Sequence, residues 1–98
     1  MTVYNAPVQD MKFVLNDVLQ ISKYSNLPGF ADASEDVVEA ILEEGAKMAA
    51  NVLHPLNQSG DKEGCTRHDD ASVTTPKGFK EAYNLFTEGG WQGLSFDP

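Results

Sequence analysis

The apolar positions of residues 8–19 recur at the spacing of one helical face. Pro7 favours a helix start because the first turn does not need the N–H that proline lacks, and Asp10 lies in that turn, where the helix dipole favours negative charge. The apolar face would carry Met11, Val14, Leu15, Val18 and Leu19. The run 26–30 contains Pro28 and Gly29, and is predicted to end this first helix.

The strongest helical pattern lies between residues 35 and 53. Ser34 is a suitable N-cap, and the acidic pair 35–36 follows it in the first turn. Pro55 is predicted to stop the helix, since the residue before a proline is pushed out of the α region. The apolar stripe comprises Val38, Ile41, Leu42, Gly45, Met48, Ala49, Val52 and Leu53. We therefore predict a second helix from about Glu35 to about Leu53.

Within this second helix the two sides differ in chemistry. Ile41 and Leu42 are expected to face the core of the fold. Glu43 and Lys47 are spaced as a favourable i,i+4 pair on the polar side. Glu44 belongs to the same polar side, so the pair 43–44 is expected to be ordinary solvated surface.

Residues 57–74 are polar and rich in turn-forming residues. Turns are expected at 59–61, which reads Ser-Gly-Asp, and at 63–64, which reads Glu-Gly. Residues 65–67 and 72–74 are predicted to pair as a short β-hairpin around Asp69 and Asp70. The two aspartates are expected to be solvated.

A third helix is predicted after this loop. Thr75 and Pro76 have the chemistry of an N-cap followed by the first helical position, and Gly89–Gly90 is a stop signal. The apolar face of the helix would carry Phe79, Ala82, Tyr83 and Phe86. The predicted fold class is therefore all-α: a small helical module of about three amphipathic helices, with a short β-hairpin near 65–74. Three such stripes cover one another only partly, so some apolar surface is expected to pack on a partner or a further domain.

The charge of the chain excludes several partners. There are 15 acidic against 7 basic residues, a formal net charge of -8, and both halves of the chain are acidic. Such a field repels phosphate backbones and anionic lipids, so we expect neither nucleic-acid binding nor stable membrane insertion. No apolar run approaches the roughly 20 residues that span a bilayer, and residues 1–7 lack the basic and apolar regions of a signal peptide. A cytoplasmic location is expected.

Candidate metal ligands are few. Cys65 is the only cysteine, so no intrachain disulfide can form, and a reducing compartment is the simpler assumption. Cys65 and His68 have the spacing of one zinc-ligand pair, but the other histidine, His54, stands alone, and a structural zinc site needs four ligands. A calcium loop starting at Asp61 would need a glutamate where Ser72 stands. A solvated loop without metal or nucleophilic chemistry is the favoured interpretation.

The glycines at 89, 90 and 93 invite comparison with a nucleotide-binding loop. A dinucleotide fingerprint places its glycines between a strand and a helix, whereas these follow a predicted helix. A helix stop and a tight turn are therefore favoured. Trp91 beside them is expected to be an apolar anchor rather than a group that stacks on a cofactor.

The run Glu88–Pro98, which reads Glu-Gly-Gly-Trp-Gln-Gly-Leu-Ser-Phe-Asp-Pro, resembles a motif of the acyl-CoA dehydrogenase family. In that family a helix of the amino-terminal domain ends in a Gly-x-x-Gly-apolar turn that runs to a proline and then to Tyr-Gly-Gly; Gly90, Gly93, Leu94 and Pro98 match. Further pieces resemble long bacterial members in order and spacing: 4–7, 10–15, 27–30, 52–57, 60–61, 63–65 and 74–83. Nearly the whole chain is covered.

The resemblance implies that the parent protein is an FAD-dependent oxidoreductase of fatty acid metabolism. In the family a glutamate removes the α-proton of an acyl-CoA and hydride passes from the β carbon to flavin N5, giving a 2-enoyl-CoA. The catalytic carboxylate and most flavin contacts lie in later domains, so no catalytic, cofactor-binding or metal residue is expected in this chain. The chain would be a single amino-terminal segment, 1–98, with an extension at 1–33 and the start of the helical domain at 34–98.

The same resemblance implies what such a segment does. Its helical domain supplies part of the acyl cavity wall and of the contacts within a homo-oligomer, and its partners are the remaining domains of the parent enzyme. The fragment itself would be structural and would bind no flavin. Two alternatives stay open: a free-standing acidic helical interaction module, and a small metal-binding regulator that rests on Cys65 and His68.

Overall fold

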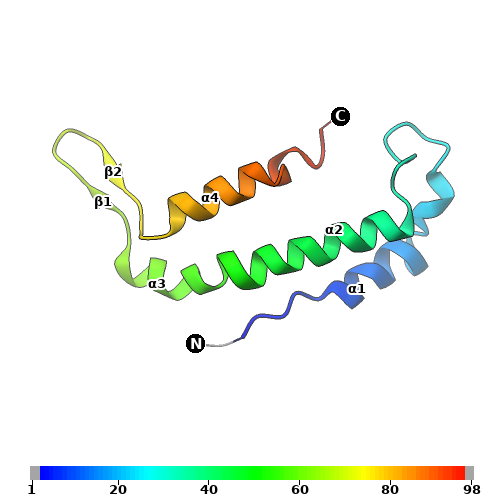
Figure 1. Ribbon diagram of the computed structural model, residues 1–98, viewed down its shortest axis with the longest axis horizontal. Helices are drawn as coiled ribbons and strands as arrows, with labels where there is room; N and C mark the ends of the chain where they lie inside the picture. The colour runs from blue at the N-terminus through cyan, green and yellow to red at the C-terminus, as the bar shows by residue number, and fades with distance from the viewer. Residues whose placement is uncertain (1–2, 97–98) are drawn as a thin grey trace. The chain divides into compact units, whose positions relative to one another are not determined.

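The computed structural model describes residues 3–96 (Figure 1). These residues form two compact units, 3–50 and 51–96. The first unit contains α1 (Val8–Lys12), the π-helix η1 (Phe13–Val18), the 3-10 helix η2 (Ile21–Tyr24) and α2 (Glu35–Lys47). The second contains α3 (Pro55–Glu63), β1 (Thr66–Arg67), β2 (Val73–Thr74), α4 (Phe79–Glu88) and the 3-10 helix η4 (Trp91–Gly93). The π-helix η3 (Met48–Leu53) contains the boundary. The mostly helical fold with one hairpin confirms the predicted class.

The first predicted helix begins directly after Pro7, as expected, but its winding changes from α to π after about one turn. α1 runs from Val8 to Lys12 and continues as η1. The Leu19 N–H donates to the Val14 carbonyl at 2.8 Å, a five-residue step that belongs to the wider π turn. Gln20 then adopts a left-handed conformation with φ of 50°, which ends the helix.

The segment between η2 and α2 is a series of hydrogen-bonded turns, as the proline and glycine at 28–29 predicted. The N–H groups of Leu27, Phe30 and Ala33 each donate to the carbonyl three residues earlier, at 2.9–3.1 Å. Gly29 has φ of +88°, a conformation that side-chain-bearing residues rarely adopt. The chain therefore reverses direction, and α1 and α2 run in opposite directions (Figure 1).

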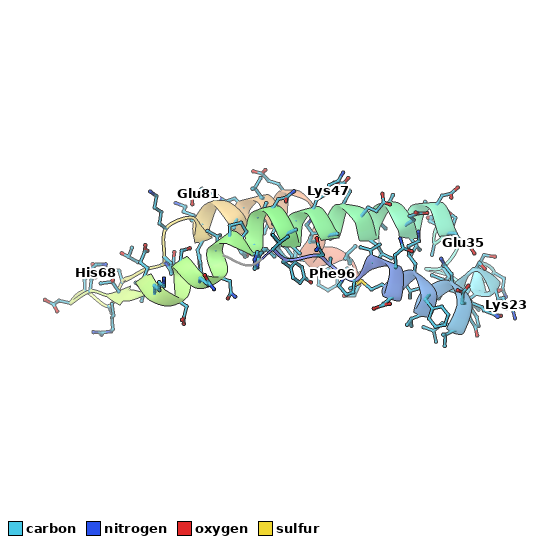
Figure 2. All side chains as sticks on the ribbon, turned by 90° about the horizontal axis from the view of Figure 1, so that it is seen from below. Lys23, Glu35, Lys47, His68, Glu81 and Phe96 are labelled. Carbon is cyan, nitrogen blue, oxygen red and sulfur yellow. The ribbon has the colours of Figure 1, made fainter. Side chains whose placement is uncertain are left out.

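Both ends of the second predicted helix are confirmed. The Ser34 hydroxyl accepts from the Val37 N–H at 3.3 Å, as an N-cap does. Helical structure continues through α2, whose first and last residues, Glu35 and Lys47, are labelled in Figure 2, and ends with η3 at Leu53. The last six residues take the wider π winding, which the apolar spacing did not indicate.

Two expectations about the sides of α2 were wrong in part. Lys47 donates to Glu44 at 2.9 Å rather than to Glu43, because residues three and four apart are both neighbours on a helix and spacing alone does not choose between them. Ile41 is 40 % exposed, whereas Leu42 is half-buried. In the first unit α1 packs against α2 on the side of Leu42 and is tied to it by Lys12, whose Nζ lies 2.7 Å from Glu39 Oε1.

The loop predicted at 57–63 is instead the helix α3. Pro55 was expected to stop a helix, but it lies at the start of α3, where its missing N–H is tolerated. The expected turn at 59–61 was therefore wrong, and in place of the turn expected at 63–64 Glu63 ends α3 and Gly64 is its C-cap, with φ of 66°. Gly60 is buried, and a Cβ added to it would lie 2.5 Å from Phe79 Cζ. A tertiary contact thus explains why glycine stands inside this helix.

The third predicted helix starts three residues later than expected. Thr75 and Pro76 are not its N-cap and first residue; Gly78, with φ of +92°, precedes α4. The Phe79 N–H donates to the Pro76 carbonyl at 3.2 Å, and the Lys77 N–H donates to Glu63 at 2.6 Å, so residues 76–79 form a turn held by the end of α3. A Cβ at Gly78 would lie 2.7 Å from Leu56 Cδ2. Because α3 approaches Gly78 closely, residues 76–79 form this turn and do not extend α4 by one more helical turn.

The predicted hairpin is confirmed at 66–74. Thr66 pairs with Thr74 and Arg67 with Val73 in antiparallel register. At its tip the Asp70 carboxylate accepts from the Ser72 hydroxyl at 2.6 Å and from the Ser72 N–H at 3.0 Å. These bonds, first the one from the hydroxyl, hold the pKa of Asp70 below its ordinary value of 3.8.

The end of α4 is also as predicted. Gly89 is the C-cap and Gly90, with φ of 76°, follows in the left-handed conformation. The short helix η4 then carries Trp91, which is half-buried and stands against Gly89. Among residues 3–96, no helix is both long enough and apolar enough to cross a bilayer.

The contact between Gly60 and Phe79 predicts the effect of a larger residue. Gly60→Val should lower the free energy of unfolding by about 1–3 kcal/mol, because the added side chain overlaps the aromatic ring. The exposed Gln58→Val, a valine in the same helix, should change it by less than about 0.5 kcal/mol. Urea denaturation followed by circular dichroism measures both. Equal losses in the two variants would show that valine in α3, not the contact, is responsible.

The tip of the hairpin predicts a pH effect of stated sign. Because the folded state depresses the pKa of Asp70, its stabilising contribution is present above pH 3.8 and is lost as the pH falls through the lowered value. Ser72→Ala removes the hydroxyl donor and should raise the pKa of Asp70 toward 3.8, measured by NMR titration of its carboxyl carbon. Ser59→Ala, on α3, should leave it unchanged. A lowered pKa that survives Ser72→Ala would assign the effect to the backbone donor alone.

Candidate functional site

The hairpin places the predicted metal candidates on the surface. Cys65 is exposed beside β1, and His68 lies beyond β1 on the hairpin, as labelled in Figure 2. His68 Nε2 lies 2.6 Å from the Thr74 hydroxyl oxygen, so this ring nitrogen already has a partner within the hairpin. In the described part of the chain no three His, Cys, Asp or Glu side chains gather to hold a metal ion. Cys65 and His68 are therefore not joined by a third such side chain within residues 3–96.

The glycine turn after α4 does not fit a phosphate group. Such a group needs free N–H donors at the start of a helix. Here the N–H groups of Gly89, Gly90 and Gly93 already donate to the carbonyls of Leu85, Thr87 and Gly90, at 3.0–3.1 Å. The Trp91 ring fills the space beside Gly89, where a Cβ would lie 2.7 Å from its Nε1. These residues offer a flavin pyrophosphate no cradle, and no catalytic step can be derived from them.

What the second unit presents instead is an open apolar groove of about 470 Å³ between α3 and α4, which we call the α3–α4 groove. Its lining comprises Leu53, Leu56, Asn57, Phe79, Ala82, Tyr83 and Phe86. The predicted face of α4 is thus confirmed as one wall. The other wall comes from Leu53 at the end of η3, which the predicted apolar stripe included, and from α3, which sequence reasoning missed. Pro55 was interpreted as a stop, whereas a proline can also mark the first position of a helix.

The α3–α4 groove has the chemistry of a packing surface. Ala82, 5 % exposed, is the only buried residue among those that line the groove. Tyr83 is 66 % exposed and Phe79 39 %, although both are aromatic. Apart from the Tyr83 hydroxyl and the Asn57 amide, the lining has no polar side-chain group, and it has no carboxylate, amine, imidazole or thiol. Such a groove can take an apolar ligand or side chain, but it holds no carboxylate to act as a general base.

A second, smaller groove belongs to the first unit, and we call it the α1–α2 groove. It has a volume of about 350 Å³ and is lined by Asp10, Met11, Val14, Leu15 and Leu42. Three of the five apolar residues predicted for the first helical face take part in it. The Asp10 carboxylate is the only ionisable group in its lining.

The chain is similar in sequence to three proteins that are each named as an acyl-CoA dehydrogenase. The chain is 35 % identical over 92 residues to 3-methylmercaptopropionyl-CoA dehydrogenase of Ruegeria pomeroyi, covering 94 % of this chain and 16 % of the relative. It is 32 % identical over 90 residues to butyryl-CoA dehydrogenase of Syntrophomonas wolfei, covering 89 % and 15 %. A broad-specificity linear acyl-CoA dehydrogenase of Mycobacterium tuberculosis is 28 % identical over 98 residues, covering 99 % and 16 %. No protein-family model matches the chain.

These three matches agree with the resemblance carried by the motifs. Each match covers most of this chain, yet the chain spans only about 15–16 % of the length of each relative. Homology therefore extends to a part of these enzymes and not to the whole. The chain belongs to the acyl-CoA dehydrogenase family, as a segment homologous to part of its long members.

Proposed function

We propose that this chain is a structural segment of an FAD-dependent acyl-CoA dehydrogenase that oxidises an acyl-CoA to a 2-enoyl-CoA. The α3–α4 groove is the observation that carries the proposal. It is apolar and open, and its lining has no carboxylate, amine, imidazole or thiol. The chemistry and the flavin then belong to other parts of the enzyme, and this segment packs against them.

The exposure of the apolar side chains supports a packing role. Leu53, Phe79 and Tyr83 line the α3–α4 groove and are 44 %, 39 % and 66 % exposed, whereas large apolar side chains in a self-contained domain are mostly inside. Contiguous exposed apolar surface of this kind is typical of an interface. Burying it would gain about 25 cal/mol per Å² of apolar area.

The alternative of a free-standing interaction module uses the same surface. It differs in what covers the groove: a separate protein rather than the remaining domains of the same enzyme. The metal-binding regulator has no comparable support, since His68 is engaged with Thr74.

The proposal predicts that this chain alone is inactive. It also predicts that the chain supports activity when it is joined to the remaining domains of a homologous enzyme. The purified chain should lack flavin absorbance and should not reduce an electron-accepting dye with any acyl-CoA. A chimera in which it replaces the homologous segment of the Ruegeria pomeroyi enzyme should retain both flavin and acyl-CoA oxidation.

A variant of that chimera tests the role of the α3–α4 groove. Ala82→Asp places a carboxylate at its buried residue and should abolish flavin retention and activity, because an unpaired buried charge is not tolerated. The exposed Asn84→Asp, which adds the same charge to the same helix, should leave both intact. A flavin-bound, active isolated chain, or a folded chimera without flavin and activity, would refute the proposal.

The exposed grooves also predict self-association of the chain when no other domain covers them. We expect a dimer or higher oligomer at about 100 µM, a concentration suited to weak contacts. The net charge of -8 opposes association, but salt screens it over about 8–10 Å, whereas apolar burial is not screened. Association measured by sedimentation should therefore strengthen with salt.

Paired variants locate the contact. Tyr83→Glu should weaken association, since it charges the most exposed aromatic residue of the α3–α4 groove, and Asn84→Glu, with the same change of charge, should not. A monomer at both low and high salt would contradict the prediction.

A further inference from the structure

We draw no further inference here: the strongest candidate, the α1–α2 groove of the first unit, is an uncovered apolar face with one carboxylate in its lining, and nothing in the structure shows what covers it.

Discussion

The second unit is organised by the contact between the Phe79 ring and the backbone of Gly60. The chain leaves α3 at Gly64, passes through the hairpin and returns at Gly78, and the ring then meets α3 at a position where a side chain would collide with it. Leu56 makes the reciprocal approach to Gly78. Because Phe79 lies against Gly60 and Leu56 lies against Gly78, α4 approaches α3 closely. Ala82 is buried as a result. The α3–α4 groove exists as a consequence of this approach.

The same arrangement leaves most of the apolar surface uncovered. A small chain has too little volume to surround several amphipathic faces, and here the aromatic residues of α4 remain partly in water. Since the groove has no carboxylate, amine, imidazole or thiol, its chemistry is that of packing. Family membership and this surface together support a segment that completes a larger enzyme rather than one that acts by itself.

Charge acts differently in the two units. In the first unit Lys12 pairs with Glu39 across α1 and α2, and Lys47 pairs with Glu44 within α2. Because the carboxylates of this unit outnumber its lysines, the unit remains negatively charged. The α3–α4 groove is neutral in its lining, whereas the α1–α2 groove contains Asp10. One chain therefore offers two apolar surfaces that differ in the charge of their linings.

The sequence by itself determined the helical class, the Ser34 cap, the span from Glu35 to Leu53, the hairpin at 66–74, the stop at Gly89–Gly90 and the family. These features depend on local chemistry: caps, turn residues, apolar spacing and motif order. The division at 33–34 into an extension and a helical domain stays a prediction. The tertiary structure alone decided that 55–63 is a helix and that α4 starts at Phe79 rather than near Pro76. The reason is that Gly60 and Gly78 look like turn formers in isolation, whereas in the fold they are the positions where Phe79 and Leu56 pass close to the backbone.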